Sequence, residues 1–172
     1  MAEHPFSLRF DFQPAKSREL IKGELIFLEG GEIKVETLDD LTGLWDVTSG
    51  LAGYQEPMSY LIKGRGCIPP TEALTGQRQW SVSTLGQQNW KKGIEGLIFP
   101  IWPETVTLET ETNITVIRDH FGVHRDANVP GSSGCIVLTD EEQWLDFCEV
   151  MRDLHKKGVL ELPLEVRYYP TT

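Results

Sequence analysis

The segment DHFGVHRDANVPGSSGCIVL, residues 119–138, joins an alternating apolar stretch, a loop and a short β-branched run. The first stretch ends at His124, and Cys135 opens the β-branched run Ile136-Val137-Leu138. Eleven positions separate the histidine from the cysteine, and glycine, proline and asparagine between them favour a turn. We therefore expect the chain to double back and to place the imidazole beside the sulfur.

This pairing suits a cysteine nucleophile with a histidine base. A thiol with a pKa of about 8.5 is mostly protonated at neutral pH, so it needs a base or a cation to become reactive. Ser133 and Gly134 are small enough to let backbone N–H groups converge on an oxyanion, where each donor lowers the barrier by about 2.7–4 kcal/mol. We predict Cys135 and His124 as catalytic, with Ser133 and Gly134 in the oxyanion site. The alternative is a turn followed by a buried, inert cysteine, because free cysteines are often buried.

The pattern V-H…P-G-S-S-G-C-I-V-L, at residues 123–124 and 130–138, resembles the catalytic signature of the L,D-transpeptidase (YkuD-like) family. The short histidine-to-cysteine loop is more similar to the compact peptidoglycan-active members. The segment KGRGCIPP, residues 63–70, and Thr48-Ser49-Gly50 resemble a turn of those members. The resemblance implies a mainly β fold, a YkuD-like β-sandwich of mixed strands, and cysteine-dependent acyl transfer or hydrolysis on peptidoglycan stem peptides through a thioester.

The sequence departs from the family pattern beside the cysteine. Typical members have a histidine directly before the Gly-Cys pair and an arginine soon after it, whereas this chain has Ser133 and then Val137-Leu138. Arg118 and Arg125, on either side of His124, are our candidates for the missing substrate-binding cation. The alternative for each is a solvated arginine at a strand edge.

Two further polar residues near His124 are assigned to the substrate site. Asp126 or a loop carbonyl is expected to bond the second ring nitrogen of His124 and so orient it. His120 lies four positions earlier, about 13 Å away on a continuous strand at about 3.3 Å per residue. We therefore place His120 at the rim of the pocket or in a structural role.

The other cysteines give no metal or disulfide pattern. The chain has three cysteines and no C-x-x-C pair, and its one His-x-x-x-His pair, His120 and His124, is expected about 13 Å apart on a strand, so we predict free thiols, no metal and no cofactor. Cys67 is the weaker candidate nucleophile because no histidine lies near it in sequence. Cys148 is expected in a helix core.

Length and charge limit the domain organisation and the partners that the sequence predicts. The chain has 172 residues, 40% of them hydrophobic, and a net charge of −10. We expect one domain over 1–172, with an N-terminal β hairpin region at 1–40 and a catalytic part at 41–172. The negative charge argues against nucleic acid as a partner. The sequence shows no membrane span and no signal peptide. We therefore expect action at the cell envelope only after non-classical export or lysis, and a cytoplasmic protein otherwise. The sequence does not predict an oligomeric state.

Local patterns predict the main elements. Phe6, Leu8, Phe10 and Phe12 alternate with polar residues, as in a half-buried strand. Residues 139–157 predict a helix that follows Cys135, opened by a Thr139 capping box. Phe99 and Trp102 are expected in the core, with stacking on sugar rings as the alternative, and Trp90 on an exposed loop.

Two other functions remain open at this point. A non-catalytic β-sandwich that binds cell-wall glycan or a protein would keep the fold without needing the thiol. An unrelated cysteine protease would use the same dyad on ordinary L-peptides. Alkylation of Cys135 tests the first alternative, and mass spectrometry of muropeptides tests the second.

Overall fold

The computed structural model describes residues 5–30, 32–33, 43–126 and 131–169, and this part of the chain is mainly β with one α-helix. Two short 3-10 helices, η1 (Ser59–Leu61) and η2 (Thr71–Ala73), interrupt the loops before β5. The strands are β1 (Phe6–Phe12), β2 (Gly23–Glu29), β3 (Glu32–Ile33), β4 (Leu44–Ser49), β5 (Ser81–Ser83), β6 (Gln87–Asn89), β7 (Gly96–Trp102), β8 (Thr105–Glu109), β9 (Thr115–Asp119), β10 (Gly122–Arg125), β11 (Ile136–Leu138) and β12 (Glu161–Tyr168).

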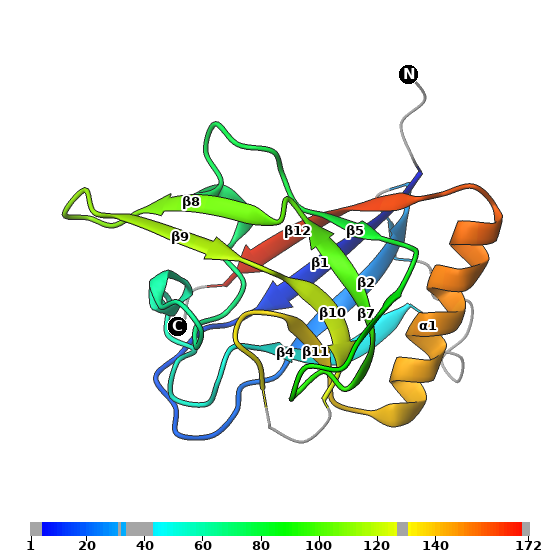
Figure 1. Ribbon diagram of the computed structural model, residues 1–172, viewed down its shortest axis with the longest axis horizontal. Helices are drawn as coiled ribbons and strands as arrows, with labels where there is room; N and C mark the ends of the chain where they lie inside the picture. Colours follow the sequence, from blue (N-terminus) through cyan, green and yellow to red (C-terminus); the bar gives the residue numbers. More distant parts are fainter. Residues whose placement is uncertain (1–4, 31, 34–42, 127–130, 170–172) are drawn as a thin grey trace.

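Eight of these strands close into a barrel (Figure 1). The order around it is β1-β12-β5-β7-β10-β11-β4-β2, and β2 pairs with β1 again. The parallel pairing of β1 with β12 joins strands from the two ends of the chain. The mainly β class is therefore confirmed. The expected sandwich of two separate sheets is not confirmed, because one sheet closes on itself and leaves no free edges in the barrel.

The N-terminal strands have the predicted alternation. Leu8, Phe10 and Phe12 are buried and Phe6 is half-buried. A hairpin is present in the predicted 1–40 region, with Leu28 of β2 opposite Ile33 of β3, and residues 34–40 of that region lie outside the described residues. Since β1 and β2 belong to the same barrel as β10 and β11, these two strands of the 1–40 region are part of the scaffold that holds the candidate site.

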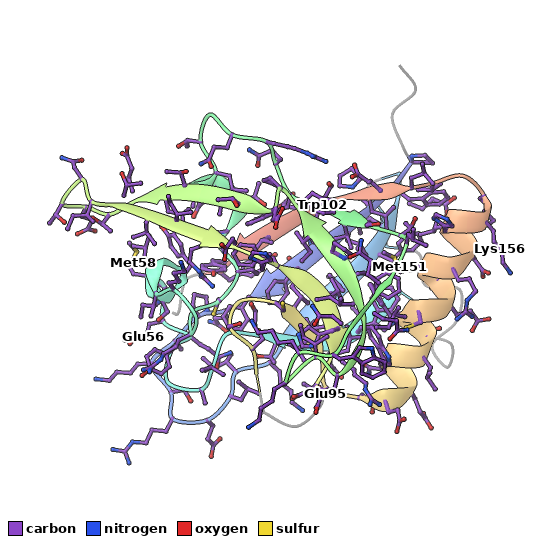
Figure 2. The ribbon with its side chains drawn as sticks, viewed as in Figure 1. Glu56, Met58, Glu95, Trp102, Met151 and Lys156 are labelled. Carbon is purple, nitrogen blue, oxygen red and sulfur yellow. The ribbon has the colours of Figure 1, made fainter. Side chains whose placement is uncertain are left out.

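The predicted helix is α1 (Glu141–Lys156), and it begins one residue later than the Thr139 box implies. Asp140 is the N-cap, and its Oδ1 accepts the N–H of Gln143 at 2.9 Å. Figure 2 shows Met151 on the side of α1 that faces the strands and Lys156 pointing away. The buried face of α1 consists of Trp144, Phe147, Cys148, Met151 and Leu154.

The expected continuous strand before His124 is wrong. The strand β9 ends at Asp119 and β10 begins at Gly122, because His120 adopts a left-handed backbone with φ of 59°. Phe121 then turns into the core, where its ring lies 5.0 Å from that of Trp80. As a result β8 and β9 form a separate two-stranded sheet, which extends away from the barrel on the side opposite α1 (Figure 1).

Membrane insertion by a helix finds no support in the described ranges, where no helix is long and apolar enough to cross a bilayer.

Candidate active site

The strands β7, β10 and β11 present two different faces. Val123 lies in the main core, whereas Ile98, Val137 and Cys135 form a second, small apolar cluster. His124 is paired in register with Val137 on one side and with Ile98 on the other. Paired residues of neighbouring strands point to the same face, so the His124 and Cys135 side chains share the face that is turned away from the main core.

A cavity of about 790 Å³ opens on this face, and both His124 and Cys135 line it. Figure 2 labels Trp102 and Glu95 at the two ends of β7, whose residues form one wall. With a strand spacing of about 4.8 Å and a rise of about 3.3 Å per residue, the two Cα atoms lie about 8 Å apart diagonally. Side chains of this size can meet across such a diagonal.

His124 is held as a neutral base. Its side chain is buried, at 3% exposure, and its Nδ1 lies 2.7 Å from the carbonyl oxygen of Arg125. A carbonyl only accepts, so Nδ1 carries the proton and Nε2 keeps a lone pair. Burial lowers the pKa of His124 below its ordinary value, and the Arg125 bond only partly opposes this. The group that orients the ring is a carbonyl, but it belongs to Arg125 of β10 and not to the loop or to Asp126 as expected.

Cys135 rests as a protonated thiol. Burial raises its pKa to about 11, while a backbone hydrogen bond from Gly122 and the charges of Lys91 and Arg118 act in the opposite direction. The thiol donates to the carbonyl oxygen of His120 at 3.8 Å. No hydrogen bond joins it to His124 among the residues that the structure describes. The bond from the thiol to the His120 carbonyl must therefore be exchanged for one to the imidazole before the proton can pass, and such catalytic hydrogen bonds often tighten only when substrate binds.

The loop that carries Cys135 is anchored to the end of β4. The Ser132 hydroxyl donates to the Cys135 carbonyl at 2.6 Å and accepts the N–H groups of Gly50 and Gly134, both at 3.3 Å. Ser49 Oγ donates to the Gly134 carbonyl at 3.1 Å. The sequence did not predict these hydroxyl bonds of Ser49 and Ser132; the Thr48-Ser49-Gly50 motif was the available signal.

Gly134 and Gly122 occupy places that a side chain would fill. Gly134 has φ of +130°, and a Cβ there would overlap the guanidinium of Arg118 and approach the Phe121 ring to 2.9 Å. Gly122 lies beside Cys135 in the sheet, and its Cβ would press on Ile98. Close approach and backbone conformation therefore require glycine at position 134, whereas at position 122 the Ile98 side chain would have to shift. Gly122 was missed, although it lies two residues before His124.

Arg118 is not the solvated strand-edge residue of the alternative interpretation. It is 2% exposed and donates to four carbonyl oxygens. These belong to Tyr60 (2.7 Å), Cys67 (2.8 Å), Gly66 (3.2 Å) and Ser133 (2.9 Å). Although Arg118 lines the cavity, its terminal N–H groups already tie the 60–67 loop to Ser133. Its role in carboxylate binding stays a prediction.

The other predicted substrate residues are placed differently. His120 lines the cavity and is 73% exposed, and its ring nitrogens lie 3.1 Å from Glu104 and 3.2 Å from Asp119. Arg125 and Asp126 are not among the residues that line the cavity. Burial raises the pKa of Asp126, against a hydrogen bond from the Gly131 backbone. The cavity thus brings together His124, Cys135, Ser133, Arg118 and His120, but not Arg125 and Asp126.

The remaining sequence candidates lie elsewhere. All three cysteines are free and buried. Cys67 donates to the Ser49 carbonyl at 3.2 Å, and burial raises its pKa to about 12. Phe99 is in the core as predicted, whereas Trp102 is only half-buried and lines the cavity. Trp90 is 75% exposed, as predicted.

No protein-family model, curated protein or solved structure matches this chain. No group of three or more His, Cys, Asp or Glu side chains that could hold a metal ion occurs within the described ranges.

Proposed function

We propose that this protein is a cysteine-dependent acyltransferase or hydrolase that acts on peptidoglycan stem peptides, as an L,D-transpeptidase-like enzyme. The observation that carries the proposal is the placement of His124 and Cys135 on one face of β10 and β11, lining one cavity. The imidazole has its Nδ1 bound to a carbonyl and its second nitrogen available as a base.

The chemistry follows from the resting protonation states. The thiol proton of Cys135 passes to Nε2 of His124, and the sulfur attacks an amide carbonyl of the substrate. The C–S bond forms, the C–N bond breaks, and the leaving amine takes the proton from His124. Water or an acceptor amine then cleaves the thioester, which gives hydrolysis or transpeptidation. Backbone N–H groups near Ser133 and Gly134 are the proposed oxyanion donors.

The substrate class rests on the sequence resemblance. The pattern at 123–124 and 130–138 supports a peptidoglycan peptide, and the family assignment with its YkuD-like sandwich is part of the same proposal. Anchoring of the Cys135 loop by Ser49, Ser132 and Arg118 supports a catalytic role, because a nucleophile must be held by a rigid surround. Access to the cell envelope would come from non-classical export or lysis.

Mass spectrometry of muropeptides tests this function. Purified peptidoglycan is incubated with wild type, Cys135→Ala and the control Cys148→Ala, which removes a buried thiol of α1 outside the cavity. We expect changed stem peptides with wild type and with the control, and none with Cys135→Ala. Unchanged muropeptides together with Cys135-dependent cleavage of L-peptides would favour the cysteine protease. Binding of glycan without any product would favour the non-catalytic module.

A further inference from the structure

The cavity has charged groups of both signs on its wall. The acidic groups Glu104 and Asp119 both bind the ring of His120, with distances of 3.1 and 3.2 Å. The basic groups are Arg118 and three exposed lysines, which are Lys63, Lys91 and Lys92. The acidic groups therefore have a local partner, and the basic groups decide which anion the cavity can accept.

The loop between β6 and β7 brings Lys91 to the wall of the cavity that the Cys135 thiol also lines. The two strands pair from Gln87 opposite Ile98 to Asn89 opposite Gly96. Because β7 also pairs with β10, both ends of the loop lie close to the strand that carries His124. Ile94 of this loop packs on the Cys135 cluster. The side chain of Asn89 accepts the Lys91 N–H at 2.9 Å, and the Lys91 carbonyl accepts the N–H of Ile94 at 3.0 Å.

Lys91 also has its ammonium group available to an anion, unlike the guanidinium of Arg118. The four terminal N–H groups of Arg118 donate to carbonyl oxygens. Within the described part of the chain, no carboxylate lies at ion-pair distance from the Lys91 ammonium. The positive charge of Lys91 acts on the Cys135 thiol, whereas neither Lys63 nor Lys92 is among the charges that do so. Of the three exposed lysines on the cavity wall, Lys91 is therefore the candidate partner for an anion beside the sulfur.

We propose that Lys91 is the carboxylate-binding residue of this cavity, and that the substrate carries a free carboxylate close to the carbonyl that Cys135 attacks. This inference rests on the proposed function and names the residue that replaces the arginine expected after the cysteine. The net charge of −10 repels anions from the protein as a whole. A preference for an anionic reagent at Cys135 therefore requires a local cation.

Two alkylating reagents of similar size separate this local effect from catalysis. Iodoacetate carries a carboxylate and iodoacetamide a neutral amide. In both, the sulfur attacks the CH₂ carbon, the C–S bond forms, iodide leaves and the thiol proton passes to the buffer. The rates at Cys135 are measured by peptide mass spectrometry at mildly alkaline pH and divided by the rates for free N-acetylcysteine. The resulting iodoacetate-to-iodoacetamide ratio is compared among wild type, Lys91→Gln, Lys91→Arg and Lys156→Gln.

We expect Lys91→Gln to lower this ratio about threefold, the size of an exposed ion pair. Lys91→Arg should keep it, and Lys156→Gln, which removes the same charge at the far end of α1, should leave it unchanged. A ratio unaffected by Lys91→Gln would overturn the Lys91 assignment while Cys135 remains the proposed nucleophile. A thiol that reacts with neither reagent in the folded protein, but with both after denaturation, would overturn both proposals.

The same assignment is tested on substrate. A stem peptide with a free C-terminal carboxylate and its carboxamide are compared for binding to Cys135→Ala, so that turnover is not needed. We expect Cys135→Ala with Lys91 intact to bind the carboxylate form more tightly than the carboxamide. The double variant Cys135→Ala, Lys91→Gln should bind both forms equally. Equal binding of both forms when Lys91 is present would contradict the carboxylate site.

Discussion

Nδ1 of His124 lies 2.7 Å from the carbonyl oxygen of Arg125, its neighbour in the chain. The bond fixes the ring and its tautomer without a carboxylate. Because burial lowers the pKa of His124 while it raises that of Cys135 to about 11, the pair rests in its uncharged form. The site is therefore suited to removal of the thiol proton by His124 as a general base once substrate is bound. It is not suited to a thiolate that is already present before binding.

Replacing His124 tests this activation. We expect His124→Ala to lower the rate of thioester formation by about 10²–10⁴-fold, the usual contribution of a positioned base. In this variant the rate of Cys135 alkylation should rise steadily as pH approaches about 11, the pKa of the buried Cys135 thiol. The control is His155→Gln on α1, which lies outside the cavity. A His124→Ala variant with wild-type acylation rate would contradict the assigned base.

The lowered pKa of His124 also predicts a pH dependence of stability. In the unfolded chain the imidazole has its ordinary pKa of 6.5, so the unfolded state binds the proton first as pH falls. The contribution of His124 to the free energy of unfolding should therefore be complete above pH 6.5. It should be lost as pH falls from 6.5 through the lower pKa of the folded state. Urea unfolding of wild type and His124→Gln measures the difference. Identical pH profiles above the range where carboxyl groups titrate would contradict a neutral buried His124.

Gly134→Ala tests the close approach behind the nucleophile. A left-handed backbone costs an L-residue about 1–2 kcal/mol, and the overlap with Arg118 and Phe121 adds about 1–3 kcal/mol of overpacking. The matched control is Gly53→Ala, because Gly53 has φ of +85° but nothing within 4 Å of the added Cβ. We expect a clearly larger loss of unfolding free energy for Gly134→Ala, measured by urea denaturation. Equal losses would mean that the loop moves aside.

Arg118→Lys tests the anchoring of the two loops. A lysine has three N–H donors on one nitrogen and cannot match the planar set that reaches four carbonyls, so a loss of about 3 kcal/mol in unfolding free energy is expected. Arg78→Lys serves as control, since its ion pair with Glu161 is exposed and such pairs contribute about 0–1 kcal/mol. A small effect of Arg118→Lys would show that the carbonyls find other donors.

Local chemistry made several elements predictable from the sequence. The alternation at 6–12 identified β1, and the apolar spacing at 144–154 identified α1. Both patterns depend on residues close together in the chain. The turn chemistry between His124 and Cys135 likewise indicated that the two strands would lie side by side, and β10 pairs with β11.

Other features depend on partners that are distant in sequence. The left-handed backbone at His120 and the turn of Phe121 onto Trp80 ended a strand that alternation alone would continue. Arg118 looked like a surface residue because its carbonyl partners lie at 60–67 and 133. Lys91 could not be related to Cys135 by spacing, since its loop reaches the site through the pairing of β6 with β7.

The sequence by itself determined the strand and helix patterns and the candidate pair His124 and Cys135, because side-chain periodicity and turn propensity act over a few residues. Only the tertiary structure decided that the sheet closes, that Arg118 is buried, and that Lys91 lies with the thiol on one cavity. The reason is physical: burial, charge and hydrogen-bond partners of a side chain are set by whichever strands pack beside it, and strand pairing joins positions far apart in the chain.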